Sequence, residues 1–385
     1  MYKHRINTRM SKTLHTALNT SIILVEQFLL TLAAPCADQA SKELSGKDVL
    51  PLLSASSTSL KAQVTKLSLL AINSPFTHSA IATVVSDLNK SVLPSLVTAA
   101  LLVTPVYHTK SFQAEVLVLV NSALRELDLL LKEIQAVASK VDEAKLAQKG
   151  DNELSQSEKN VVTLAAGRTW EACDMLTDLA AKGVVGFVIR RVEEWRDLVR
   201  DAVDEIEEWD PEEEGDDFFD ELLSDDGKQN AGMSESKPSE TDENSEDSDA
   251  LHEHKRNAIR ILKPVTQIFP AIIMNRLKKV PKLSPFIVKQ LELLMSNLRH
   301  IPDNVDEVAG ALYEANLSKT NQYLEKTKDN AINAIKSVAS PWDSANLVDS
   351  EQQTDDKFAI WSKTWLNVMR EVSKSAVDDD GNIEK

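Results

Sequence analysis

Few residues of this chain have the types and spacing that hold a metal ion. His252, Glu253 and His254 offer three metal-binding side chains in a row, but they stand in a solvated acidic stretch and need further ligands from elsewhere. The two cysteines, Cys36 and Cys173, are far apart and match neither a metal-binding spacing nor a disulfide framework. The sequence therefore predicts no metal site and no cofactor.

Residue patterns for catalysis are also missing. The sequence contains no glycine-rich phosphate loop, no HExxH motif and no GxSxG motif. Acidic pairs such as Glu193 with Glu194 alternate with arginines, among them Arg190 and Arg191. This alternation is typical of a solvated helix face crossed by ion pairs, not of acid–base machinery. We therefore expect a protein that is not an enzyme and has no catalytic residues.

The elements that carry these side chains are predicted to be helices. Apolar residues recur every three or four positions almost everywhere, and we find no convincing strand-like alternation. Leucine, alanine, lysine and glutamate dominate, and these favour helices, whereas glycine (10) and proline (13) are few in 385 residues. Amphipathic helices with short connections pack antiparallel. The sequence therefore predicts an all-α protein of two antiparallel helical bundles.

Three positions should interrupt or begin helices. Pro94 should kink a helix over residues 77–103, because proline removes a backbone donor and crowds the preceding turn. Gly183 stands between two stretches of helical pattern. Ser284 followed by Pro285 is typical of a helix cap and first turn. These residues predict where the bundle helices bend, end and start.

A heptad pattern marks a long helix expected over residues 109–144. It has two interpretations: a leucine zipper that pairs with another chain, or the inward stripe of a bundle helix. Additional apolar residues widen the face beyond a two-residue seam, and a wide face needs several neighbouring helices, so we favour the bundle core. The seam residues are Leu117, Val120, Leu124, Leu127, Leu131, Ile134, Ala138 and Val141, and the widening residues are Val116, Ala123, Leu130 and Val137.

The N-terminus has some features of a targeting peptide. Lys3, Arg5, Arg9 and Lys12 precede an apolar stretch over residues 22–32. The apolar residues keep a helical spacing throughout, and acidic and amide side chains interrupt the stretch, which favours the first helix of a bundle. No segment has the roughly 20 clean apolar residues of a membrane span, so we expect no membrane partner.

The charge is concentrated in one segment. The net charge of the chain is −17, and from Glu207 to Ala250 there are 19 acidic residues against two lysines. Such a segment cannot bury enough apolar surface to fold, and it repels nucleic-acid phosphates. We therefore expect an N-terminal bundle over residues 1–207, an acidic disordered linker over 208–250 and a C-terminal bundle over 251–385, with no direct nucleic-acid binding.

The acidic segment also contains a candidate docking motif. Phe218, Phe219, Leu222 and Leu223 are bulky apolar residues among acids. In one interpretation they dock in a groove of a protein partner, with the acids steering them toward a basic rim. In the other they form a fraying helix that packs back on its own bundle. The sequence leaves both interpretations open.

The most specific motif lies in the N-terminal half. The segment GRTWEACD at residues 167–174, together with RDAVDEIE at residues 200–207, resembles the cyclin-D-binding protein family, also called the cyclin-D-interacting or maid-like proteins. The similarity covers about residues 50–210. The acidic middle and the helical C-terminal region agree with the layout of that family.

This resemblance implies a fold and a function. Family members are all-helical proteins of two bundles, similar in style to vinculin- and talin-type bundles, without enzymatic activity. They bind D-type cyclins and helix-loop-helix transcription factors, act as negative regulators of cell-cycle progression and transcription, and occupy the nucleus and cytoplasm. We therefore expect a regulatory interaction protein with such a protein partner; the alternative is a vinculin-like structural adaptor for cytoskeletal proteins.

The motif itself has a core interpretation and a binding interpretation. Trp170 and Cys173 share one side of the expected helix, which favours a tightly packed core with the tryptophan as its anchor. Arg168, Glu171 and Asp174 lie more to the other side, where they could form a partner-binding patch. These three, with the four apolar residues of the acidic segment, are the candidate partner-binding residues.

Overall fold

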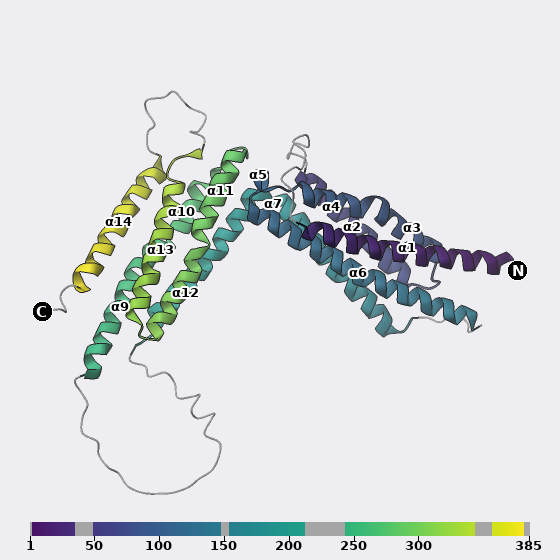
Figure 1. Cartoon of the computed structure of the whole chain (residues 1–385), viewed down its shortest axis with the longest axis horizontal. Helices are drawn as coiled ribbons and strands as arrows, with labels where there is room; N and C mark the ends of the chain where they lie inside the picture. Colours follow the sequence, from purple (N-terminus) through teal and green to yellow (C-terminus); the bar gives the residue numbers. More distant parts are fainter. Residues whose placement is uncertain (1, 35–48, 148–153, 212–242, 343–355, 381–385) are drawn as a thin grey trace, which may run out of the picture. The chain divides into compact units, whose positions relative to one another are not determined.

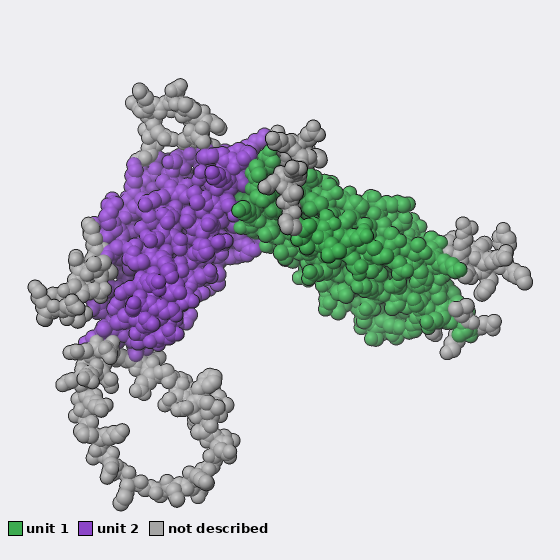
Figure 2. All heavy atoms as spheres, viewed as in Figure 1, with its two compact units in different colours: residues 1–187 green, residues 188–385 purple. Residues whose placement is uncertain are grey.

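The computed structural model describes residues 2–34, 49–147, 154–211, 243–342 and 356–380 (Figure 1). All regular secondary structure in these ranges is helical, which confirms the expected all-α fold. The chain divides into two units, Met1–Phe187 and Val188–Lys385, coloured separately in Figure 2. Each unit is a helical bundle with its own apolar core.

Unit 1 is built around a long central helix. α6 packs against α1 and also contacts α2, α4 and α5. α6 runs antiparallel to α1, because His15 contacts Asp142 whereas Asn19 contacts Gln135. It also runs antiparallel to α7, because Lys140 pairs with Glu158 whereas the Phe112 ring meets the Phe187 ring. The elements are α1 (Tyr2–Ala33), α2 (Val49–Ile72), α3 (His78–Asp87), η1 (Leu88–Val92), α4 (Leu93–Leu102), α5 (Pro105–His108), α6 (Lys110–Leu146) and the first part of α7 (Gln156–Glu208).

The heptad pattern of α6 belongs to the core of this bundle. Leu124, Leu127 and Leu131 are fully buried, and so are Val116 and Leu130 from the wider part of the face. A seam between two chains would leave the flanks of the helix exposed, whereas here several helices of the same unit cover them. The bundle-core interpretation is therefore confirmed for α6 in this chain.

Pro94 interrupts its helix in the expected region. The helix over 78–102 consists of α3, the π-helical turn η1 and α4, and Pro94 follows η1 in the first turn of α4. A π turn widens the backbone ring and so relieves the clash and the lost hydrogen bond that proline causes. The interruption therefore places two shorter helices against α1 and α2.

The first helix meets the criterion for a candidate membrane span by length and composition. The stretch is Ser11–Ala33 of α1, and 22% of its apolar 18-residue segment is buried inside the structure. Leu14, Leu18 and Val25 are fully buried against the bundle. This helix therefore supplies core residues to unit 1, as the helical spacing predicts.

Unit 2 is a second bundle in which α13 is the most connected helix. α13 packs against α9, α11 and α12, and α14 lies at one edge against α9 and α13 (Figure 1). Its elements, besides the last part of α7, are α9 (Glu243–Thr266), α10 (Ile268–Asn275), η2 (Leu277–Lys279), α11 (Pro285–Leu298), α12 (His300–Tyr313), α13 (Leu317–Ser337) and α14 (Lys357–Asp380).

Side chains cap the N-termini of two helices of unit 2, and the cap at Ser284 was predicted. The Ser284 hydroxyl accepts a hydrogen bond from the backbone N–H of Ile287, and Pro285 is the first residue of α11. Asn316 caps α13 in the same way through Lys319. Such caps satisfy backbone donors that have no partner inside the helix. They therefore fix the short connections that hold neighbouring helices side by side.

The boundary between the units differs from the predicted one. α7 bends at Gly183, whose φ of 63° lies in the left-handed region that glycine tolerates, and then continues to Glu208. The part after the bend belongs to unit 2, where Glu205 accepts a hydrogen bond from the Tyr313 hydroxyl at 3.0 Å and Glu207 pairs with Lys263 at 2.6 Å. The predicted boundary at residue 207 is therefore about twenty residues late.

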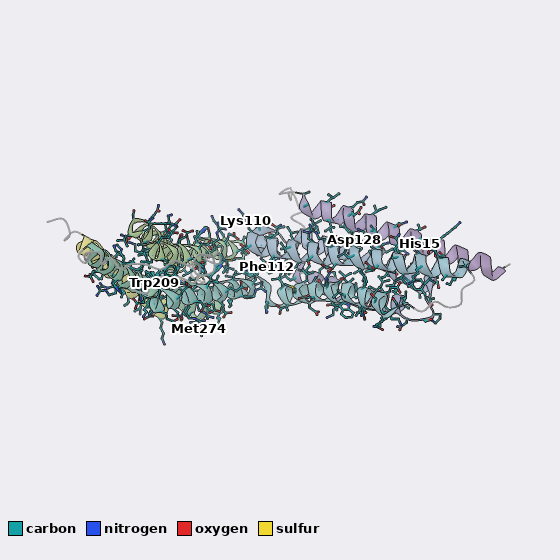
Figure 3. All side chains as sticks on the ribbon, turned by 90° about the horizontal axis from the view of Figure 1, so that it is seen from below. His15, Lys110, Phe112, Asp128, Trp209 and Met274 are labelled. Carbon is teal, nitrogen blue, oxygen red and sulfur yellow. The ribbon has the colours of Figure 1, made fainter. Side chains whose placement is uncertain are left out.

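The predicted linker over 208–250 is also too long. The rings of Trp209 (labelled in Figure 3) and Tyr313 meet edge to face, with their centroids 4.9 Å apart. Residues 243–250 form the first turns of α9. Acidic side chains near a helix N-terminus are favoured by the helix dipole, so acids alone do not exclude a helix there. The remaining part, residues 212–242, lies outside the described residues.

Candidate interaction surface

The motif at residues 167–174 lies in the first part of α7, between α2 and α6. Asp174 pairs with Lys61 of α2, both carboxylate oxygens lying 2.6 Å from the ammonium nitrogen. Glu158 pairs with Lys140 of α6 and also accepts hydrogen bonds from Ser155. These contacts lower the pKa of Glu158 to about 2, chiefly through the Lys140 hydrogen bond. The position of the motif helix is therefore set from both sides.

One side of the motif belongs to the core. Thr169, Ala172 and Cys173 are buried, and the Thr169 hydroxyl donates to the carbonyl of Ala165 at 3.0 Å. Burial, and then the negative charge of Asp174, raise the pKa of the Cys173 thiol to about 12. The thiol therefore stays neutral and packs as an apolar group, without the thiolate character that a nucleophile needs.

Trp170 differs from its neighbours in the core. Its side chain is partly exposed, whereas Cys173 and Leu176 are fully buried. The indole Nε1 atom is itself buried and has no hydrogen-bond partner in the described part of the chain. The expectation that Trp170 anchors the core is therefore wrong in part, because its side chain is only partly buried.

The other side of the motif is open. Arg168, Glu171 and Asp174 are all exposed, as predicted. Asp174 turns toward α2 and its lysine, while Arg168 and Glu171 form no ion pair with any residue that the structure describes. The structure therefore separates the three candidates into one paired acid and two unpaired charges that share a face.

Exposed apolar residues continue this face in both directions. Val161, Leu164 and Met175 are exposed, Leu164 by 58%. Positions 161, 164, 168, 171 and 175 follow the three- and four-residue steps that align side chains along one side of a helix. We call the residues Val161, Leu164, Gly167, Arg168, Glu171 and Met175 the α7 face.

Sequence reasoning missed the apolar members of the α7 face. Leu164 and Met175 follow the same helical spacing as core residues, so only their exposure in the folded unit separates them from the core. Gly167 gives a further indication, because a Cβ atom added there would meet nothing within 4 Å. The packing of unit 1 therefore does not require a glycine at this position.

A polar cluster at one end of unit 1 was also missed. Asp142 of α6 bonds to His15 of α1 at 3.1 Å and to His78 of α3 at 2.9 Å, and it accepts a hydrogen bond from Ser11 (Figure 3 labels His15). Burial lowers the pKa of His78 despite the nearby carboxylate. For Asp142, burial would raise the pKa, but the hydrogen bonds from Ser11 and His15 outweigh it and lower the pKa.

The cluster has a structural role. The Ser11 hydroxyl donates to the carboxylate, not to a histidine, so the cluster contains no serine activated by a neighbouring base. Within the described ranges, no group of three or more histidine, cysteine or acidic side chains has the arrangement of a metal site. The cluster therefore joins α1, α3 and α6.

The four apolar candidates of the acidic segment remain untested. Phe218, Phe219, Leu222 and Leu223 lie outside the described residues. The choice between docking on a partner and packing on the chain's own bundle is therefore still open for them.

These features define a class of protein: an all-α molecule of two helical bundles, with a surface of apolar and charged residues along one long helix. Residues 52–212 match the family described as Grap2 and cyclin-D-interacting, N-terminal. This match covers part of the N-terminal half and confirms the resemblance to a cyclin-D-interacting family that was drawn from the motif. No curated protein matches the chain. The matched residues contain the whole of α7, including the α7 face.

Proposed function

We propose that this chain is a non-catalytic regulatory protein that binds a protein partner through the α7 face. The observation that carries this proposal is the exposed stripe formed by Val161, Leu164 and Met175 beside two unpaired charges. Exposed apolar residues in a continuous stripe are typical of binding surfaces, and a helix with such a stripe binds well to an apolar groove or to a second helix.

The centre of the α7 face supports close approach by a partner. Glycine inside a helix costs about 1 kcal/mol relative to alanine, so a helical glycine without a packing reason needs another explanation. Gly167 is such a residue, since a side chain there would extend into open space. A partner backbone that lies directly against Gly167 accounts for both the missing side chain and the apolar residues on either side.

The family indicates the kind of partner. The family description names cyclin D and Grap2 as interacting proteins. We infer that this chain binds a D-type cyclin or a helix-loop-helix factor and acts as a negative regulator of cell-cycle progression, in the nucleus and cytoplasm. Because Arg168 and Glu171 carry opposite charges, they orient a bound partner but add little net electrostatic attraction to it.

A substitution at Gly167 tests the proposal without disturbing the core. Gly167→Leu adds a side chain that points into open space, so the unit should stay folded, with an unchanged or slightly higher melting temperature. The same side chain blocks close approach, so affinity for a purified D-type cyclin should fall at least tenfold. Calorimetric titration of the full chain measures the affinity, and circular dichroism measures the melting temperature.

A matched control adds the same side chain elsewhere. Ser122 is an exposed residue of α6, and Ser122→Leu should leave cyclin binding unchanged. If Gly167→Leu binds cyclin as tightly as the parent chain, the α7 face is not the binding surface. If the parent chain captures cytoskeletal proteins and no cyclin, the vinculin-like alternative replaces the regulatory role.

A further inference from the structure

Unit 2 contains a stretch whose charge is strongly one-sided. Residues 254–291 contain nine lysines and arginines and no aspartate or glutamate. The stretch forms most of α9, then α10, η2 and the first half of α11. Its exposed bases include Lys278 and Lys279 in η2, Lys289 in α11, and Lys282 in the connection between these two elements. This part of the surface therefore attracts negatively charged partners.

One side of α11 adds apolar side chains to this basic surface. Phe286 and Leu293 are 48% and 49% exposed. Lys289 lies between them at steps of three and four residues, so the three side chains share one side of the helix. Lys282 and Leu283 are also exposed and stand just before the helix begins. We call these five residues the α11 face.

The packing of unit 2 does not use the α11 face. The opposite side of α11 supplies the core residues Ile287, Val288, Leu291, Leu294 and Met295. Lys282 and Lys289 form no ion pair with any residue in the described ranges. Phe286 and Leu293 leave about half of their surface in water, although burial of apolar surface is favourable. The face therefore combines apolar surface with uncompensated positive charge.

The helix itself does not explain the lysine at the start of this face. The N-terminal end of a helix carries a partial positive charge, so a cation beside it is unfavourable. Lys282 nevertheless stands two residues before Ser284, the N-cap of α11. An acidic group of a partner placed here would interact favourably with both the lysine and the helix end.

The charge of the whole chain favours a small acidic partner over an extended polyanion. Anionic membranes and nucleic acids present negative charge over a wide area, and the chain has a net charge of −17 that repels them. A partner helix as long as α11, which has 14 residues, spans only about 21 Å. Such a helix covers the α11 face and little else, so it meets the lysines without the repulsion.

We propose that the α11 face binds an amphipathic helix of another protein, one side of which alternates acidic and apolar residues at steps of three and four. Two apolar side chains of that helix pack against Phe286 and Leu293, and the carboxylate between them pairs with Lys289. A second carboxylate, beyond the apolar residue at Phe286, pairs with Lys282. This inference goes beyond the binding of a partner to the α7 face, because it rests on other residues in the other unit.

Two designed peptides test the chemistry of the partner. The acidic peptide has leucine and glutamate alternating at steps of three and four along one side of a helix, with alanine and glutamine at all other positions. The basic peptide has lysine in place of each glutamate. Fluorescence anisotropy of the labelled peptides with the full chain measures both affinities. The acidic peptide should bind at least tenfold more tightly, and the difference should shrink as salt rises.

A charge reversal locates the polar part of the contact. The double variant Lys282→Glu with Lys289→Glu changes two exposed side chains, so the unit should stay folded. Its preference should reverse, with the basic peptide binding more tightly than the acidic one. A reversal of preference cannot result from unfolding, which would weaken the binding of both peptides.

A second pair of substitutions locates the apolar part. Phe286→Ser with Leu293→Ser should weaken binding of the acidic peptide at least tenfold, because the contacts that shield these side chains from water are lost. The matched control, Ile360→Ser with Val368→Ser, alters similarly exposed residues of α14 in the same unit and should leave the affinity unchanged. Circular dichroism checks that all variants fold.

Three results would overturn the proposal. The first is equal affinity of the acidic peptide for the parent chain and the charge-reversed variant. The second is binding that survives the substitutions at Phe286 and Leu293. The third is binding of the parent chain to phosphatidylserine vesicles but not to the acidic peptide, which would make the α11 face a membrane-binding surface. The result for Gly167→Leu and cyclin does not affect these measurements, so the two proposals fail separately.

Discussion

Each unit contains a carboxylate that joins several helices, but the two units give it different cationic partners. In unit 1, Asp142 receives hydrogen bonds from Ser11 and contacts His15 and His78. In unit 2, Asp356 forms a two-point ion pair with Arg276, at 2.6 and 3.1 Å. Both networks connect the ends of helices that are distant in the sequence.

The arginine network is the more completely satisfied of the two. The Arg276 side chain is 5% exposed and also donates to the backbone carbonyls of Val338 and Ala339, at 2.7 and 2.8 Å. Its guanidinium lies 4.4 Å from the centre of the Phe358 ring. A buried charge is stable only when hydrogen bonds replace its water, and here they do. The arginine therefore joins the end of α13 to the start of α14.

The different cationic partners make the two bundles respond differently to pH. Arginine stays protonated at all ordinary pH values, so the unit 2 network changes only when Asp356 takes up a proton. The hydrogen bond from Arg276 lowers the pKa of Asp356, which moves this event to strongly acidic conditions. A histidine changes charge near neutral pH, so unit 1 should respond first.

Of the changes considered, removing Arg276 should reduce stability the most. Arg276→Ala leaves the carbonyls of Val338 and Ala339 without donors and opens a space beside Phe358, so unit 2 should lose about 2–4 kcal/mol of stability. Hydrogen exchange should rise in α13 and α14 but not in α6. The matched control, Arg299→Ala, alters an exposed arginine and should have little effect. Unchanged exchange in α13 would show that the network does not stabilise the unit.

Lowering the pH from 7 to 5 should destabilise unit 1 more than unit 2. Burial first, and then Lys145 and His15, lower the pKa of His78, against the pull of Asp142. The unfolded chain therefore binds this proton at higher pH than the folded chain, and stability falls as the pH drops below about 6.5, the ordinary histidine value. The pKa values of Asp142 and Asp356 are lowered from 3.8, so the stability they contribute is lost only at lower pH.

Hydrogen exchange in α3 and α6 measures this response. His78→Gln keeps a hydrogen-bonding side chain without the proton that histidine takes up, so its unit 1 should lose less stability between pH 7 and pH 5. If the parent chain and this variant respond equally, the titration belongs to another group and the comparison between the units fails.

Removing the ion pair between Lys61 and Asp174 should change stability the least. The side chains of Lys61 and Asp174 are 39% and 61% exposed, and exposed pairs contribute about 0–1 kcal/mol. Asp174→Ala should therefore change the stability of unit 1 by less than about 1 kcal/mol in urea unfolding. A loss much larger than this would show that the pair, and not the buried side of α7, holds the motif helix in place.

Much of the fold could be predicted from local patterns. The caps at Ser284 and the breaks at Pro94 and Gly183 act on neighbouring backbone, so the residues themselves specify them. The unit boundary could not be predicted in the same way. The second part of α7 has the same helical pattern as the first, and only its contacts with Tyr313 and Lys263 assign it to unit 2.

The candidate site was predictable only in part. Arg168, Glu171 and Asp174 are charged, and solvation of charges alone predicts their exposure. Leu164 and Met175 are apolar, and the sequence gives them the same pattern as the buried Leu176. Which apolar residues stay outside depends on how many neighbours surround the helix, and the spacing within one helix contains no such information.

By itself, the sequence determined that this chain forms helices, that they have apolar sides, that its acids concentrate in one segment and that residues 167–174 resemble a cyclin-D-interacting family. These properties depend on side-chain chemistry and on contacts three or four residues away. The tertiary structure alone decided where α7 passes from one unit to the other, which carboxylate meets a histidine or an arginine, and which apolar stripes remain uncovered. Those outcomes depend on contacts between residues far apart in the chain, which no local pattern specifies.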